Sequence, residues 1–188
     1  ERLGIDNVGA LNNAIAGGRS REVILVSEAL HEQHITDIAR QIAHRRREAR
    51  IVLISGPSSS GKTTFSRRLA IQLLALGLSP FALELDSYFV DREKTPLDGQ
   101  GQFNFEALEA LDLNLLGDHL TRLVAGELVS MPRYDFKAGR QVPGDAVQLT
   151  PEQIIILEGI HGLDPRLLPA ALSSRAFHIY GAALTQLN

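Results

Sequence analysis

The sequence predicts an α/β fold in which helices cover both faces of a parallel β-sheet. Short apolar runs alternate with longer stretches of helical periodicity along most of the chain, as in proteins with parallel sheets. Residues 51–55, Ile-Val-Leu-Ile-Ser, form a β-branched apolar run of the kind that parallel sheets bury on both sides. A glycine-rich loop and a helical stretch follow this run directly, so a strand–loop–helix unit is expected at the start of the sheet.

The first 50 residues are predicted to form an N-terminal helical extension, and residues 51–188 the main domain. A short helix is expected over residues 6–16, and a longer helix after the break at Gly17-Gly18. Apolar residues recur at mostly helical spacing in this longer helix. A chain of 188 residues that is 44% hydrophobic is long enough for one domain with a substantial core.

The helix after the glycine-rich loop is predicted over residues 64–76. Its apolar residues stand four positions apart, which is the pattern of a helix that packs on a sheet. Gly77 stops this helix and Pro80 prevents it from continuing. The second strand is then expected over residues 81–85, with Asp86 directly after it.

The second half of the chain is predicted to contain an irregular segment, one helix, a β-hairpin and two further strands. Asp112 caps the helix and Gly126 stops it. The hairpin is expected as an insertion between this helix and the next strand, because two partly alternating runs flank a Lys-Ala-Gly-Arg turn. In order, the elements are expected at residues 91–102, 113–124, 129–136 with 142–149, 154–157 and 176–180.

The glycine-rich loop has the pattern G-x-x-x-x-G-K-[ST] of a phosphate-binding loop. Its residues, with the threonine that follows, are Gly56, Pro57, Ser58, Ser59, Ser60, Gly61, Lys62, Thr63 and Thr64. The four fixed positions should match by chance in a chain of this length on the order of one time in a hundred. Backbone N–H groups and the helix dipole favour an anion here, while Lys62 reaches the β- and γ-phosphates and the Thr63 hydroxyl ligates Mg²⁺. The motif predicts that the chain binds a nucleoside triphosphate.

Two carboxylates are expected to meet these phosphates. Asp86 follows the second strand and Glu158 follows the apolar run 154–157, and ligands of open parallel sheets bind outside the carboxyl ends of the strands. Mg²⁺ takes one or two carboxylates together with substrate phosphates, so Glu158 is the natural second anchor beside Thr63. Asp86 is placed to accept a proton from an attacking hydroxyl. The alternative for each carboxylate is that it caps a local turn.

Composition excludes several other functions. The net charge of −3 and the pI near 6.1 argue against a general binder of nucleic acids or anionic membranes. The basic cluster at residues 44–47 and Arg50 is interpreted as a solvated helix end rather than a docking patch. The chain has no cysteine, which fits the cytoplasm, and no apolar run approaches the roughly 20 residues of a membrane span. Because the chain starts at Glu1 and stops soon after the run at 176–180, we expect it to be part of a longer protein.

With these residues assembled, the chain resembles the uridine kinase and phosphoribulokinase family of phosphate-loop kinases. The resemblance extends in order and rough spacing from about residue 51 to residue 180 and implies the fold of P-loop nucleoside triphosphate hydrolases. The phosphate loop alone is common to a very large superfamily, so the four segments after it carry the resemblance. The matching segments are residues 56–65, 85–89, 101–106, 132–136 and 156–160.

The resemblance implies roles for individual residues. It implies that Asp86 is the catalytic base and shares in the Mg²⁺ shell with Thr63 and Glu158. It also implies that Glu106, an Asp in typical uridine kinases, holds sugar hydroxyls and that Tyr134 lines a nucleoside pocket. The alternatives are that Glu106 is an acid in the first turn of a helix and that Tyr134 is a half-buried hairpin residue.

Three departures from the family pattern bear on the substrate and the activity. Uridine-cytidine kinases carry a histidine shortly after Tyr-Asp-Phe, where this chain has Gly139, with Lys137 and Arg140 beside it. The arginine-rich lid that family members place after the strand near residue 180 is absent, so residues 1–188 alone are expected to bind ATP and turn over poorly. Residues 1–50 are not part of minimal uridine kinases and resemble the linker that follows a threonyl-tRNA-synthetase-like region in longer bacterial proteins.

The leading hypothesis is an ATP- and Mg²⁺-dependent kinase that phosphorylates the 5′-hydroxyl of a ribonucleoside, with Asp86 and Lys62 as catalytic residues. A phosphorylated sugar or a pantothenate-like alcohol is the alternative acceptor, which Lys137 and Arg140 would suit if it is anionic. A non-catalytic ATP-binding module is a third hypothesis. A GTPase switch is disfavoured because the chain has no N-K-x-D stretch. The expected partner is thus a small nucleoside-like molecule. Whether the protein forms a homo-oligomer is left open by the sequence.

Overall fold

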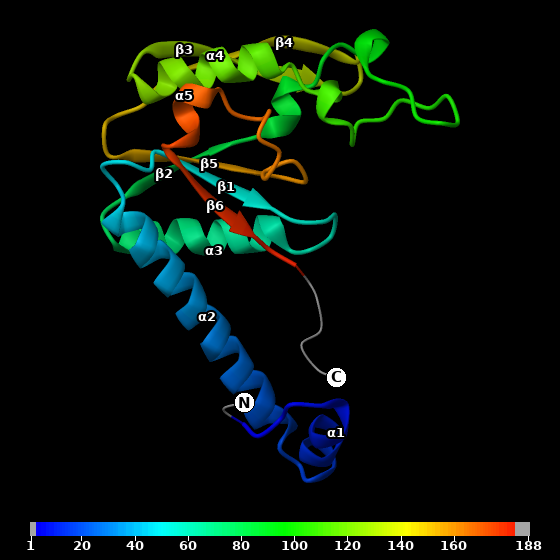
Figure 1. The fold of residues 1–188 in the computed structure, drawn as a ribbon, viewed down its shortest axis with the longest axis vertical. Coiled ribbons are helices and arrows are strands. Elements are labelled where there is room, and N and C mark those ends of the chain that lie inside the picture. The colour runs from blue at the N-terminus through cyan, green and yellow to red at the C-terminus, as the bar shows by residue number, and fades with distance from the viewer. Residues whose placement is uncertain (1–2, 183–188) are drawn as a thin grey trace.

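The structure is a computed structural model, and it describes residues 3–182. A four-stranded parallel sheet in the order β2-β5-β1-β6 lies at its centre (Figure 1). This sheet confirms the predicted α/β fold. Its strands are β1 (Ile51–Ser55), β2 (Ser79–Leu83), β5 (Gln153–Gly159) and β6 (Ala176–Tyr180).

The register of the two central strands brings their carboxyl ends to the same level. In the pairing of β1 with β5, Ile54 lies opposite Glu158 and Ser55 lies opposite Gly159. The phosphate loop begins at Gly56, one residue after the end of β1. The loop and the Glu158 carboxylate therefore start from neighbouring points on one edge of the sheet.

Helices and other segments cover both faces of the sheet, as predicted. Because successive side chains of a strand point to opposite faces, Val52 and Ile54 enter one hydrophobic cluster while Ile51 and Leu53 enter another. The first cluster is closed by α2 (Ser20–His44) and α3 (Lys62–Ala75), and the second by segments that include α4 (Leu113–Val124) and α5 (Ala170–Ser173). Figure 1 shows α3 below the sheet and α4 and α5 above it.

The second strand differs from its prediction by two residues. It runs from Ser79 to Leu83 instead of 81–85, and Leu85–Tyr88 form the 3₁₀ helix η1. Among the described strands, β2 is an edge strand paired with β5 alone, so Pro80, which lacks a backbone N–H, is tolerated inside it. Asp86 consequently lies within η1 and not directly after a strand.

The predicted hairpin forms a small sheet of its own. Its strands β3 (Leu128–Asp135) and β4 (Arg140–Gln148) are antiparallel. α4 packs beside β3, and the Asp112 side chain accepts a hydrogen bond from the Leu115 amide at 3.0 Å, as expected of an N-cap. Two short 3₁₀ helices, η2 (Arg92–Lys94) and η3 (Leu108–Ala110), interrupt the connection between β2 and α4.

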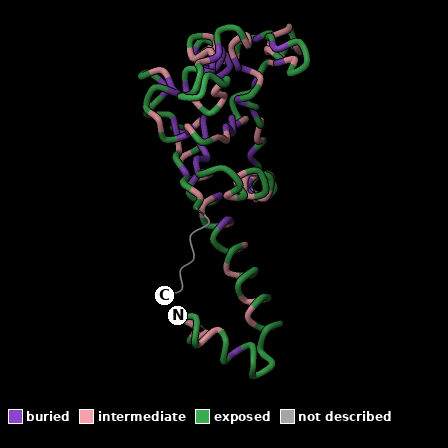
Figure 2. Tube along the Cα trace, turned by 90° about the vertical axis from the view of Figure 1, so that its right-hand side faces the viewer, coloured by how far each residue is buried: buried purple, intermediate pink, exposed green. Residues whose placement is uncertain are grey.

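The N-terminal helices form an arm that leads into the domain. α1 (Val8–Ala16) and the first half of α2 extend away from the rest of the molecule, and most of their residues are exposed (Figure 2). The second half of α2 is different, because Ile35, Ala39 and Ile42 are fully buried in the cluster that α3 shares. Within residues 3–182, no helix has both the length and the apolar character needed to cross a bilayer.

Candidate active site

The phosphate loop is shaped by close backbone contacts at its start. A side chain on Gly56 would collide with the carbonyl oxygen of Gly181, so only glycine fits where the loop leaves β1. Further on, Ser59 and Gly61 have positive φ angles of 59° and 83°. Positive φ turns successive N–H groups toward one hollow, and α3 begins directly afterwards at Lys62. Loop amides and a helix N-terminus therefore meet at one anion-sized site.

Polar groups of the loop remain available to a ligand. The Lys62 ammonium lies back across the loop, where Nζ donates a hydrogen bond to the carbonyl oxygen of Pro57 at 2.7 Å. The Ser60 hydroxyl is buried without a hydrogen-bond partner among the described residues. A phosphate seated in the loop would give both groups a charged partner.

A hydrogen bond joins the loop helix to β5. The Thr63 hydroxyl donates to Oε1 of Glu158 at 2.7 Å, across 95 residues of sequence. Oε2 of Glu158 is buried and has no partner in residues 3–182, so the carboxylate is not capping the turn that follows it. An unsatisfied buried carboxylate oxygen is costly, and its position beside Thr63 is explained if a further ligand completes the pair.

The residues present fit Mg²⁺ on the chemistry of their donor atoms. A hydroxyl, a carboxylate with one free oxygen and a neighbouring aspartate are hard oxygen ligands, and Mg²⁺ in nucleotide sites uses few protein ligands. The described part of the chain holds no group of three or more His, Cys, Asp or Glu placed to bind a metal by themselves. A metal at this point would therefore depend on phosphate oxygens and water for the rest of its shell.

Asp86 lines the same hollow as Thr63 and Glu158. The hollow has a volume of about 420 Å³ and lies between α3, η1 and the ends of β2 and β5. Burial raises the pKa of the Asp86 carboxyl, and the nearby charges of Glu84 and Glu158 raise it further. Its side chain makes no hydrogen bond within residues 3–182, so it does not cap a turn and is free to accept a proton. The structure thus brings together the three side chains that were predicted to converge.

An aromatic cluster lies next to the turn that carries Asp86. Phe89 packs edge-to-face on Phe105, Tyr134 and Phe136, with ring centroids 5.3, 5.7 and 6.4 Å away. Tyr134 is 5% exposed, and its hydroxyl is buried with no partner among the described residues. Of these four aromatic residues, only Tyr134 was predicted from the sequence to line a substrate pocket. Phenylalanine is a usual core residue, so only the positions of the three phenylalanines within the family-like segments could have indicated a site.

The other predicted substrate residues lie around this cluster without joining Asp86. Glu106 is exposed and follows Phe105 directly, and Arg140 is exposed at the start of β4, opposite Asp135. Gly139 has a φ of 68°, and the Arg92 guanidinium occupies the space where its side chain would begin. The roles assigned to Glu106 and Arg140 stay predictions. The residues after 180, where no arginine-rich lid was found in the sequence, lie mostly outside the described residues.

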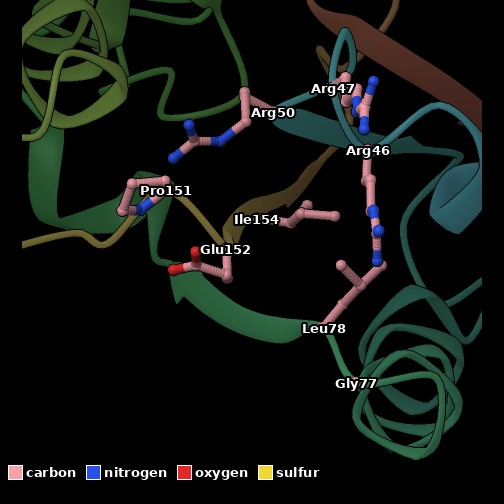
Figure 3. A pocket seen from close by; sticks show the side chains of 8 residues that line it. All are labelled: Arg46, Arg47, Arg50, Gly77, Leu78, Pro151, Glu152 and Ile154. Carbon is pink, nitrogen blue, oxygen red and sulfur yellow. The ribbon is translucent and has the colours of Figure 1, made fainter.

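The basic cluster borders a different hollow at the opposite end of the sheet. This hollow of about 430 Å³ lies where β1, β2 and β5 begin, and its lining includes Arg46, Arg47 and Arg50. Figure 3 shows the three side chains pointing apart. Arg50 donates hydrogen bonds to the carbonyl oxygens of Thr150 and Gln153 at 3.0 and 3.1 Å, so it ties down the start of β5. The three arginines therefore agree with the predicted solvated helix end. They do not converge as the cations of an anion-binding site would.

The chain is similar in sequence to known proteins. The model of the phosphoribulokinase / uridine kinase family matches residues 51–168. The chain is 34% identical over 111 residues to a uridine kinase of Chloroflexus aurantiacus, covering 58% of this chain and 51% of that protein. It is 32% identical over 128 residues to a uridine kinase of Halobacterium salinarum, covering 68% and 53%. The chain spans about half the length of the curated relatives it matches.

Solved structures show a similar fold. A possible uridine kinase from Bacillus stearothermophilus superposes with a TM-score of 0.61 at 24% identity, over 79% of each chain. A putative fructose transport system kinase from Silicibacter sp. TM1040 superposes with a TM-score of 0.56 at 22% identity, over 78% of this chain and 73% of that one. At these identities the likeness shows a shared fold.

Proposed function

The chain belongs to the phosphoribulokinase / uridine kinase family, and we propose that it transfers the γ-phosphoryl group of ATP to a hydroxyl group of a small molecule. The proposed acceptor is the 5′-hydroxyl of a ribonucleoside. One observation carries the proposal, namely that Thr63, Asp86 and Glu158 line a single hollow beside the phosphate loop. A phosphate cradle, a metal-binding pair and a free carboxylate are the parts that phosphoryl transfer requires.

The proposed mechanism gives each residue one task. The loop amides and the N-terminus of α3 bind the phosphates of ATP, and Lys62 turns from the Pro57 carbonyl oxygen toward them. Thr63 and Glu158 would hold Mg²⁺, with Asp86 beside them, and the bound ion would supply positive charge against the phosphate oxygens. Asp86 accepts the proton of the attacking hydroxyl, which its raised pKa favours because the pKa lies closer to working pH.

A nucleoside acceptor is supported by the aromatic cluster. Flat rings stack on or pack against aromatic side chains, and the unpartnered Tyr134 hydroxyl offers a hydrogen bond to a polar group of the base. Glu106 would hold the vicinal hydroxyls of the ribose, since a carboxylate accepts two hydrogen bonds at once.

A phosphorylated sugar is the second candidate acceptor, and one observation favours it. The Arg92 guanidinium lies against Gly139 and donates to the carbonyl oxygen of Phe136 at 2.6 Å, which places a cation beside the aromatic cluster. Lys137 and Arg140 on the same hairpin would add charge. An anionic acceptor would find complementary groups there.

A panel of acceptors tests both candidates. The full-length protein is incubated with ATP, Mg²⁺ and each of several nucleosides, sugar phosphates and pantothenate-like alcohols, and ADP release is measured. Stimulation by a ribonucleoside supports the proposal, whereas stimulation only by a sugar phosphate replaces the acceptor. If no acceptor stimulates ADP release and ATP still raises the melting temperature, the chain is an ATP-binding module and the proposed transfer is wrong.

A further inference from the structure

A buried tyrosine and a buried histidine bond to each other under the turn that carries Asp86. The Tyr88 hydroxyl and Nδ1 of His119 are 3.1 Å apart, and the two rings meet edge to face with centroids 5.8 Å apart. Tyr88 is 0% exposed and His119 is 7% exposed. Burial lowers the pKa of His119, so we assign a neutral ring whose Nδ1 accepts the tyrosine hydrogen.

Tyr88 is the last residue of η1, and Asp86 lies two residues before it. His119 belongs to α4, whose neighbouring residues Leu116 and Leu120 are fully buried in the core. The bond therefore connects a short turn of four residues to a helix held firmly by packing. Short 3₁₀ helices have poor internal hydrogen bonds and depend on outside contacts for their shape.

Within residues 3–182, backbone hydrogen bonds from other segments reach this turn at its C-terminal end. The Asp112 amide donates to the Tyr88 carbonyl oxygen at 2.8 Å, and the Val90 amide donates to the Ala110 carbonyl oxygen at 2.8 Å. Two backbone bonds that join η1 to its flanking residues are longer, at 3.2 Å from the Ser87 amide to the Glu84 carbonyl oxygen and 3.4 Å from the Phe89 amide to the Asp86 carbonyl oxygen. The side-chain bond to His119 adds a directional restraint two residues from Asp86.

Packing alone does not require a hydrogen-bonded tyrosine and histidine at this position. Two apolar side chains of similar size would fill the same space and leave no polar atom to satisfy, and such replacements are often neutral in stability. A satisfied buried polar pair instead restricts a segment to one geometry. The pair therefore contributes more to the position of the turn than to packing.

We propose that the hydrogen bond between Tyr88 and His119 positions η1 so that the Asp86 carboxylate faces the hollow shared with Thr63 and Glu158. Tyr88 and His119 are positioning residues in this scheme, because they act on the acceptor through Asp86 and do not touch it. The inference rests on the proposed function, in which Asp86 is the base.

Four variants of the full-length protein test the bond. Tyr88→Phe removes the hydroxyl and keeps the ring, and the double variant Tyr88→Phe/His119→Leu removes both polar partners. His119→Asn keeps an acceptor, Oδ1, at the position of Nδ1, so it is the conservative rescue. His34→Asn alters an exposed histidine on α2 and is the matched control.

Two readouts separate positioning from folding. Amide hydrogen exchange of the peptide covering residues 84–90 reports the turn without any need for activity, and it is expected to speed up several-fold in Tyr88→Phe and in the double variant. In the acceptor assay, kcat is expected to fall about 10-fold or more in both, with the KM for ATP unchanged within about two-fold, because a small misplacement of a catalytic group is costly. His119→Asn and His34→Asn should match the wild type in both readouts.

The outcomes distinguish this inference from the proposed function. Unchanged exchange at residues 84–90 overturns the inference whatever the activity, and so does faster exchange with an unchanged kcat. Normal kcat in the double variant, at an unchanged melting temperature, would mean that the pair serves packing only. If the wild type transfers phosphate to no acceptor, the proposed function is wrong and Asp86 has no role as a base. Amide hydrogen exchange at residues 84–90 would still show whether the bond between Tyr88 and His119 holds the turn.

Discussion

At the scale of single residues, the site is a place where polar atoms lack protein partners. Oε2 of Glu158, the Ser60 hydroxyl and the Tyr134 hydroxyl are buried and unpaired within residues 3–182. Buried polar groups in folded proteins are nearly always satisfied. These three are half of the six buried side-chain atoms without a hydrogen-bond partner in residues 3–182, and they lie beside the phosphate loop or in the aromatic cluster, where the proposed substrates would supply the missing hydrogen bonds.

Replacing Asp86 tests its proposed role as the base. Asp86→Asn keeps the shape and removes the proton acceptor, so turnover is expected to fall at least ~100-fold while ATP affinity stays within a few fold. Steady-state ADP release and calorimetric ATP titration measure the two effects. Asp145→Asn, which changes an exposed carboxylate on β4, is the control and should leave both unchanged. Near-normal turnover in Asp86→Asn would remove Asp86 from this role.

The raised pKa of Asp86 also predicts how its effect on stability depends on pH. An acid whose pKa is higher in the folded than in the unfolded state destabilises the fold when ionised, and the penalty disappears once pH falls below both values. In metal-free buffer at neutral pH, Asp86→Asn should therefore melt on the order of 1 °C or more above the wild type. Thermal melts should show the gap closing toward about pH 4, near the unfolded value. A gap that is the same at every pH would mean that ionisation of Asp86 is not its cause.

At the scale of elements, the turn between β1 and α3 determines where the phosphates bind. The turn leaves β1 through a glycine with no room for a side chain, and then passes through two positive φ angles before α3 starts. The Gly181 amide also donates to the Ser55 carbonyl oxygen at 2.8 Å, so the chain after β6 closes over the first residue of the loop. Loop, helix start and the end of β6 form one tight unit.

Two glycine-to-alanine variants test this unit. In Gly56→Ala the new methyl group would meet the Gly181 carbonyl oxygen, so we expect a loss of about 1–3 kcal/mol in unfolding free energy. ATP affinity should also fall, by about 10-fold or more, because each 1.4 kcal/mol of lost interaction is a factor of ten. Gly99→Ala, where nothing lies within 4 Å, is the matched control and should stay within about 0.5 kcal/mol. Urea unfolding measures the stability of both variants, and ATP titration measures their affinity. Equal behaviour of the two variants would contradict the close contact between Gly56 and the Gly181 carbonyl oxygen.

At the scale of the whole molecule, the long helix α2 belongs partly to the arm and partly to the core. Its second half buries Ile35, Ala39 and Ile42 against β1, β5 and α3, and an ion pair of 2.7 Å joins Glu32 to Arg68 of α3. The predicted division at residue 50 stays a prediction about domains. The burial implies that a protein starting at residue 51 would expose the part of this hydrophobic cluster that α2 covers.

Two truncations test where the folded unit begins. Deleting residues 1–50 removes Ile35, Ala39 and Ile42 from the cluster that α3 shares, and it should lower the unfolding free energy by at least about 3 kcal/mol. Deleting residues 1–19 removes α1 and the residues before α2, and it should change stability by no more than about 1 kcal/mol, since this part of the arm contributes little to the main core. Urea unfolding compares them, and equal stability after both deletions would place all of α2 outside the folding unit.

The sequence by itself determined the parts of this protein whose chemistry is local. The phosphate loop, the strand before it and the helix after it occupy neighbouring positions, so the pattern Gly56–Thr63 was enough to predict them. The meeting of Asp86 and Glu158 with Thr63 also followed from a general rule, because carboxyl ends of parallel strands share one edge of the sheet.

Only the tertiary structure decided the features that join distant parts of the chain. The order β2-β5-β1-β6 leaves β2 at an edge, which admits Pro80, and β2 ends at Leu83, so that Asp86 lies in η1. The aromatic cluster combines residues from three separate segments, and the bond between Tyr88 and His119 spans 31 residues. Such contacts depend on how the elements pack against one another. The periodicity of the sequence shows which face of an element is apolar, but it does not show which other element will cover that face.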